Sequence, residues 1–168
     1  MNAELELESK FWKALGSDMT MMLGVVNVED GHARPMTAQL VGEEGPIWFF
    51  TSNDTMLVKN LNKSNHGVAT FVSKNNDLYA TVHGRISLDN SRAMVDKLWN
   101  SHVAAWYEGG KSDPKLALLR FEPDHGEIWL SGSGILAGIK MLLGSDPKKD
   151  FKDNVAEVDF RKPSSAKF

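Results

Sequence analysis

The sequence predicts a mainly β fold, an antiparallel barrel with a few added helices. Segments with strand character follow one another through short turns, and no helix separates the first strand pairs. A parallel, doubly wound sheet would need a helix between successive strands. The chain has 168 residues, which suits one domain with a substantial core. We therefore expect about seven strands and three or four helices in one barrel.

The first part of the chain should contain a helix, a hairpin and a third strand. Gly16 is expected to end the first helix, and a hairpin over residues 20–41 should turn at the Glu-Asp-Gly sequence of residues 29–31. Residues 47–52 are predicted to form the third strand and residues 54–63 a short helix. The apolar residues of the first helix recur at helical spacing: Leu7, Phe11, Trp12 and Leu15.

The second part of the chain continues the pattern of strands. Residues 66–73 and 78–88 are predicted to be strands joined by a polar turn, followed by a helix over residues 90–107. Two more strands are expected over residues 115–123 and 126–131. The predicted helix has one apolar side: Met94, Val95, Leu98, Trp99, Val103 and Trp106.

The domain organisation is expected to be simple. One domain should cover residues 1–145, with a polar C-terminal tail over residues 146–168. The apolar run at 134–144 has about half the length that a membrane span needs. The N-terminus is acidic and amphipathic, unlike the basic and then apolar order of a signal peptide. We therefore expect a cytoplasmic protein.

Composition argues against several classes of function. The net charge of −3 gives no sign of a nucleic-acid-binding surface. The chain has no cysteine, which excludes disulfides, thiolate metal sites and cysteine nucleophiles. Its five histidines do not follow the spacing of a zinc hydrolase motif, and no serine lies in a nucleophile elbow.

Two neighbouring segments carry polar groups that suit a ligand. Pro35 has no N–H and therefore belongs at a strand edge, where backbone amides of the ladder become free. Arg34 before it carries a guanidinium group, whose several N–H groups can donate to a carbonyl or phosphate oxygen. Thr51, Ser52 and Thr55 stand at the start of a predicted helix, where unpaired N–H groups favour anions.

A plainer interpretation exists for the second segment. Asp54 or Ser52 can serve as an ordinary N-cap of the helix, which accounts for most of its polar character. The aromatic residues at 48–50 suit a core at least as well as a ligand contact. These residues alone therefore leave both interpretations open.

The order of motifs along the chain adds a resemblance. The motifs are Arg34-Pro35-Met36, Trp48 to Thr55, Gly84-Arg85, Trp99 with Ala105-Trp106-Tyr107, Gly109-Gly110, Asp113-Pro114, Leu118-Leu119-Arg120, Pro123 and Glu127-Ile128-Trp129. Over roughly residues 6–130 the chain resembles the flavin-binding split barrels related to pyridoxamine 5'-phosphate oxidase, and within them the general stress proteins.

The resemblance implies a six-stranded antiparallel split barrel that forms a homodimer, with FMN between the subunits and FAD as an alternative. Three groups of residues would hold the flavin. Arg34, Pro35, Met36 and Thr37 would follow the isoalloxazine edge; Phe50, Thr51, Ser52 and Thr55 would meet the ring and the phosphate; Trp106 and Trp129 would approach from the partner subunit.

Leu57 departs from the family pattern. The family usually has a lysine or arginine at this position, which pairs with the phosphate, and Lys59 is the nearest cation on the predicted helix. Losing one charge-assisted bond of roughly 1.5 to 3 kcal/mol would weaken FMN binding by about one to two decades. We therefore expect weak FMN binding or another flavin.

The resemblance leaves three functional hypotheses. The first is an FMN-binding general stress protein that acts as a flavin-dependent oxidoreductase, with the chemistry supplied by the flavin. The second is a non-catalytic flavin or tetrapyrrole binder acting in stress response. The third is a barrel without a cofactor. The sequence singles out no catalytic acid or base.

Overall fold

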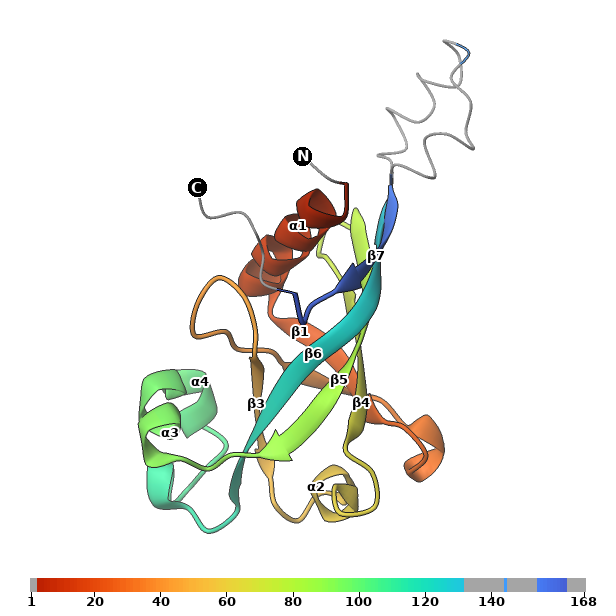
Figure 1. Cartoon of the computed structure of the whole chain (residues 1–168). Coiled ribbons are helices and arrows are strands. Elements are labelled where there is room, and N and C mark those ends of the chain that lie inside the picture. The colour runs from red at the N-terminus through yellow and green to blue at the C-terminus, as the bar shows by residue number, and fades with distance from the viewer. Residues whose placement is uncertain (1–2, 132–143, 145–153, 163–168) are drawn as a thin grey trace.

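The computed structural model describes residues 3–131, 144 and 154–162, and within them six strands form a nearly closed antiparallel barrel (Figure 1). The strands are β1 (Thr20–Val25), β2 (Arg34–Thr37), β3 (Ile47–Ser52), β4 (His66–Val72), β5 (Leu78–Leu88) and β6 (Leu116–Leu130). Their order around the barrel is β2-β1-β4-β5-β6-β3, and every pair is antiparallel. The predicted six-stranded split barrel is confirmed.

Short and long helices cover the barrel at different places. They are α1 (Ala3–Asp18), α2 (Met56–Asn60), α3 (Arg92–Leu98) and α4 (Ser101–Ala104), with single 3₁₀ turns η1 (Glu29–Gly31) and η2 (Gly110–Ser112). Helix α1 lies across one end of the barrel, α2 lies at the opposite end, and α3 and α4 lie beside β3 (Figure 1). The two ends of the barrel are therefore covered by different helices.

Alternating side chains build the core. In β4 and β5 every second residue points into the barrel, as in Phe71, Val82 and Ile86, because successive side chains of a strand face opposite sides. The apolar side of α1 closes one end with Phe11 and Leu15, both fully buried. The hydrophobic pattern read from the sequence therefore fixes which face of each strand is inside.

Two predicted strands prove to be one. Residues 115–123 and 126–131 were expected to be separate, but β6 runs through 15 residues with a register irregularity opposite His83 and Gly84. Asp124 is the extra residue of this bulge, since Gly84 pairs with Pro123 and His83 with His125. Gly84 is required here, because a Cβ would stand 2.3 Å from the carbonyl oxygen of Glu122.

The helix predicted over residues 90–107 is wrong as a single helix. Trp99 adopts an extended conformation, and the Asn100 side chain then caps α4 by accepting from the backbone N–H groups of His102 and Val103. The chain therefore turns between two short helices. Trp106, expected on the buried side of the helix, is 85% exposed beyond the end of α4.

Two helix boundaries also differ from the prediction. Helix α1 does not end at Gly16 but continues to Asp18, where Met19 takes a left-handed φ of 59° and donates its N–H to the Leu15 carbonyl. The helix expected over 54–63 is confined to five residues, Met56–Asn60. Local turns, rather than apolar periodicity, set these ends.

A seventh strand lies within the predicted polar tail. Strand β7 (Val155–Asp159) pairs with β6 along its second half, and Phe160 after it packs on Phe11 and Trp12 of α1. This strand was not predicted, because its five residues, three of them apolar, lie within a segment rich in lysine and aspartate. The apolar run at 134–144 lies outside the described residues except for Gly144.

Three histidines meet on the outside of the barrel, although they are distant in sequence. His66 of β4, His83 of β5 and His125 of β6 stand side by side. His66 Nε2 lies 3.2 Å from His83 Nδ1, and the rings of His83 and His125 stack with centroids 4.8 Å apart. Burial lowers the pKa of His83, and the neighbouring His125 and His66 lower it further.

We expect this histidine cluster to make the fold less stable in acid. Because the folded state disfavours protonated His83, the unfolded state binds more protons at this residue. Its contribution to stability is complete at pH above its ordinary pKa of about 6.5 and is lost as the pH falls toward the lower folded pKa. Denaturant unfolding of His83→Gln between pH 8 and pH 5 should therefore show a weaker loss of stability in acid than the wild type.

His32→Gln serves as the control, since His32 lies in an exposed turn away from the cluster. This variant should follow the wild-type pH dependence. If His83→Gln and the wild type lose stability equally in acid, the cluster does not cause the acid sensitivity.

Candidate functional site

The barrel has a seam between β2 and β3. Strand β3 pairs with β6 on one edge, and β2 pairs with β1 on one edge, so their other edges face each other. In the described part of the chain a single bridge joins them, with the N–H of Gln39 and of Trp48 each donating to the other's carbonyl at 2.8 Å. Residues predicted to bind a ligand, 34–37 on one side and 50–52 with Thr55 on the other, continue along this seam.

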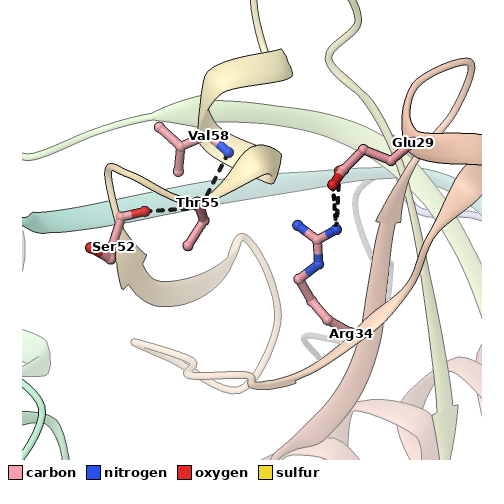
Figure 2. A network of polar contacts seen from close by, with 5 residues as sticks. All are labelled: Glu29, Arg34, Ser52, Thr55 and Val58. Atoms are coloured by element: carbon pink, nitrogen blue, oxygen red, sulfur yellow. Dashed lines mark hydrogen bonds and ion pairs between the residues drawn. The ribbon is translucent and has the colours of Figure 1, made fainter.

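Arg34 is held by a carboxylate that the sequence analysis did not consider. Its Nη2 donates to both Oε1 and Oε2 of Glu29, each at 3.0 Å (Figure 2). The two side chains are only 20% and 17% exposed, so water screens this ion pair less than a surface pair. The signal in the sequence was an acidic residue in the hairpin turn that leads into Arg34.

The turn before α2 has a different cap from either candidate. Thr55 is the N-cap, since its Oγ1 accepts from the N–H of Val58 at 3.4 Å and donates to the Ser52 carbonyl at 2.9 Å (Figure 2). Neither Asp54 nor Ser52 fills this role. The Ser52 hydroxyl instead bonds the exposed Asp54 carboxylate, which lowers the pKa of Asp54 and keeps a negative charge at the helix start.

Leu57 is a core residue, not part of a binding surface. Its side chain is 1% exposed within the main hydrophobic cluster. Lys59, in the last turn of α2, is exposed. The start of α2 therefore carries hydroxyl groups and N–H groups, but no cation occupies position 57.

Phe50 and Thr51 are held from the side by residues that flank α4, Trp99 before it and Tyr107 after it. Phe50 meets the rings of Trp99 and Tyr107 edge-on, at centroid distances of 6.1 Å and 6.4 Å. The Tyr107 hydroxyl donates to the Thr51 carbonyl, and burial together with nearby Asp113 raises the pKa of Tyr107 to about 12. Tyr107 therefore stays a neutral donor at any physiological pH.

The remaining predicted residues differ in exposure. Trp48 and Phe49 are buried in the core, whereas Phe50 is half-buried. On the other side of the seam Pro35 and Thr37 are exposed, and half-buried Met36 packs against the core. Exposed and half-buried residues therefore line the surface on both sides of the seam.

Trp106 and Trp129 do not join this surface within one chain. Trp129 lies on β6 opposite Tyr79 and Val155, at the far end from the pairing of β6 with β3. Trp106 projects from the surface after α4. Their predicted approach from a partner subunit remains a prediction.

Two cavities lie beside α1, and neither is lined by a residue predicted to bind the flavin. The larger has a volume of about 560 Å³ between α1 and the segment after β2, and the smaller, of about 190 Å³, shares Trp12 and Glu44 with it.

The described residues carry neither a candidate metal site nor a candidate membrane-spanning helix. No group of three or more histidine, aspartate or glutamate side chains there is arranged to hold a metal ion. No helix within the same ranges is long and apolar enough to cross a membrane.

Comparisons with known proteins agree on a family. The family described as pyridoxamine 5'-phosphate oxidase like matches residues 6–150. A general stress family protein of known structure from Xanthomonas campestris pv. campestris is 59% identical, with a TM-score of 0.75, over 86% of this chain and 100% of that one. The general stress FMN/FAD binding protein from Xanthomonas citri is also 59% identical, with a TM-score of 0.73, over 83% and 99% of the two chains.

A curated relative matches over a shorter stretch. General stress protein 26 of Bacillus subtilis (strain 168) is 40% identical over 67 residues, which are 40% of this chain. The match spans 46% of that relative, less than half its length. This likeness supports the same family over part of the chain.

The burial of Leu57 yields a test of the helix start. Leu57→Lys should lower the free energy of unfolding by at least about 2 kcal/mol, because it removes apolar contacts and buries a charge without a partner. Leu57→Met should cost less than about 1.5 kcal/mol, and Met56→Lys on the exposed side of α2 should be nearly neutral. Denaturant unfolding measures all three. A stable Leu57→Lys protein with a gain in affinity for FMN but not riboflavin would show that this position faces a phosphate.

Proposed function

The chain belongs to the pyridoxamine 5'-phosphate oxidase-like family, and we propose that it binds a flavin, FMN or FAD, along the seam between β2 and β3. The observation that carries the proposal is the position of the two predicted segments, 34–37 and 50–55, on opposite sides of this seam. The relative from Xanthomonas citri, described as an FMN/FAD binding protein, supports the same ligand class.

The residues at the seam suit the ring of a flavin. The isoalloxazine ring is flat and carries carbonyl oxygens at one edge, which accept hydrogen bonds from a guanidinium such as that of Arg34. Half-buried Phe50 offers an aromatic edge, and the unpaired edges of β2 and β3 offer backbone groups. A bound flavin would supply hydride or electron transfer, and these residues would hold and orient it.

The residues near the phosphate offer fewer favourable contacts than the residues near the ring. Thr55 and Ser52 supply hydroxyl groups, and Lys59 is the nearest cation on α2. Against them stand the Asp54 carboxylate and the apolar Leu57. We therefore propose that the ring contributes most of the affinity, so that selection between FMN and FAD is modest.

We also propose a homodimer that completes the site. Met22, Val72 and Tyr79 leave apolar side chains exposed on the outer face of the sheet, and Trp106 is exposed beyond α4. Exposed apolar groups of this kind are typical of contact surfaces. In the dimer the partner subunit's Trp106 and Trp129 would cover the flavin.

Flavin-dependent oxidoreduction is the activity that we propose for this site. A protein purified with bound flavin, or loaded with it, should lose its yellow colour when NADH or NADPH is added without oxygen. A flavoprotein that keeps its colour with both reductants would instead be a non-catalytic binder.

The flavin proposal is tested by titration. FMN and FAD should each bind, measured by quenching of flavin fluorescence, and Arg34→Ala should weaken both by at least about tenfold because a charge-assisted donor is lost. The melting temperature of the ligand-free variant should stay close to that of the wild type. Arg85→Ala is the control, since the exposed Arg85 pairs with Glu122 away from the seam. Unchanged affinity with a large loss of ligand-free stability would make Arg34 structural.

The dimer is tested by light scattering. The wild type should have the mass of two chains at micromolar concentration, and Trp106→Ala should shift the equilibrium toward monomer while the monomer stays folded. A monomeric wild type under these conditions would reject the shared site.

A further inference from the structure

We propose that Glu29 is a positioning residue for the flavin ring: it holds the Arg34 guanidinium so that its remaining N–H groups face the seam. The inference rests on the proposed flavin site. It adds to that site a residue from outside the two predicted segments, and it specifies what part of the ligand Arg34 recognises.

Glu29 contacts the guanidinium of Arg34 at one nitrogen, Nη2. Both carboxylate oxygens of Glu29 accept from the same nitrogen, Nη2 of Arg34. Nε and Nη1 are not used by Glu29, and Figure 2 shows Nη1 turned to the side of the view that holds Ser52 and Thr55. Glu29 thus fixes one corner of the guanidinium and leaves the other donors for a ligand.

The backbone of the turn is shaped to bring Glu29 over Arg34. Glu29, Asp30 and Gly31 have successive φ values of 52°, 54° and 70°, a conformation that side-chain-bearing residues rarely adopt. The turn is closed by the N–H of Gly31 donating to the Val28 carbonyl at 3.0 Å. Unusual backbone of this kind persists where surrounding contacts determine it and is frequent at ligand sites.

Holding Arg34 in advance favours binding. A free arginine side chain has many rotamers, and a ligand that must fix one of them binds more weakly because side-chain entropy is lost. Here the partly buried carboxylate restricts the guanidinium before the ligand arrives. Without Glu29, the guanidinium can turn into solvent, and binding must order it.

The pair also determines the chemistry that Arg34 prefers. Glu29 balances the charge of Arg34, so the pair offers donors with little net positive charge. Such donors suit the uncharged carbonyl oxygens of the flavin ring better than a phosphate dianion. The effect of Glu29 should therefore be the same for FMN and for riboflavin, which lacks the phosphate.

The experiment measures FMN and riboflavin affinities of Glu29→Ala and Glu29→Gln, each alone and combined with Arg34→Ala. Glu29→Ala should weaken both ligands about five- to tenfold, and Glu29→Gln should weaken them less, because the amide oxygen still accepts from Nη2. In the Arg34→Ala background neither change should matter further. Glu122→Ala, which removes the partner of Arg85 and Arg120, is the matched control and should bind as the wild type does.

Three results would overturn the inference. Tighter FMN binding by both Glu29 variants would show that Glu29 competes with the ligand for Arg34. If the Glu29 variants lose equal affinity with and without Arg34, Glu29 only shapes the turn. Thermal melts of the ligand-free variants would then show a lower melting temperature. If Glu29→Ala binds flavin as tightly as the wild type while Arg34→Ala binds it more weakly, the positioning role of Glu29 is rejected and the role of Arg34 is kept. A wild type that binds no flavin would instead reject the proposed function.

Discussion

The incomplete closure between β2 and β3 is the constraint on which the candidate site depends. Each of these strands has one edge paired within the barrel, and the bridge at Gln39 and Trp48 joins the other edges at one point in the described chain. Backbone N–H and carbonyl groups along the rest of both edges need another partner, whether water, a ligand or a second subunit. The seam therefore provides a row of hydrogen-bonding groups on a rigid barrel.

The polar and charged side chains around the seam are engaged with close neighbours. Glu29 balances Arg34, and the Ser52 hydroxyl is drawn to Asp54. The Glu29 carboxylate offsets the positive charge of Arg34, and the Asp54 carboxylate adds a negative charge near the start of α2, while the N–H donors of Arg34 and the aromatic edge of Phe50 remain. These groups suit a flat, carbonyl-bearing ring better than an anion, in agreement with the proposal that the flavin ring supplies most of the binding.

The sequence was most informative where the period of apolar residues was clear. Strands β3, β4 and β5 were predicted almost residue for residue. Alternation indicates β4 and β5 as strands with one buried face, and a short apolar run indicates β3. It was least informative where one residue decides the geometry. The Asn100 cap divides a helix whose apolar spacing looks continuous, and the bulge at Asp124 lets one strand run through the two segments that were predicted as separate strands. Strand β7 is held by pairing with β6, a contact between distant segments that composition does not record.

The order of motifs along the chain, through its resemblance to a family, singled out the two segments beside the seam. By itself the sequence also determined the class of fold and the pairing of the first hairpin. Those features follow from local propensity and periodicity, which each segment carries in its own residues. Only the tertiary structure decided that Leu57 faces the core, that Thr55 caps α2 and that Glu29 meets Arg34. These outcomes depend on where a side chain points once the barrel has closed, and residues near one another in sequence do not fix that direction.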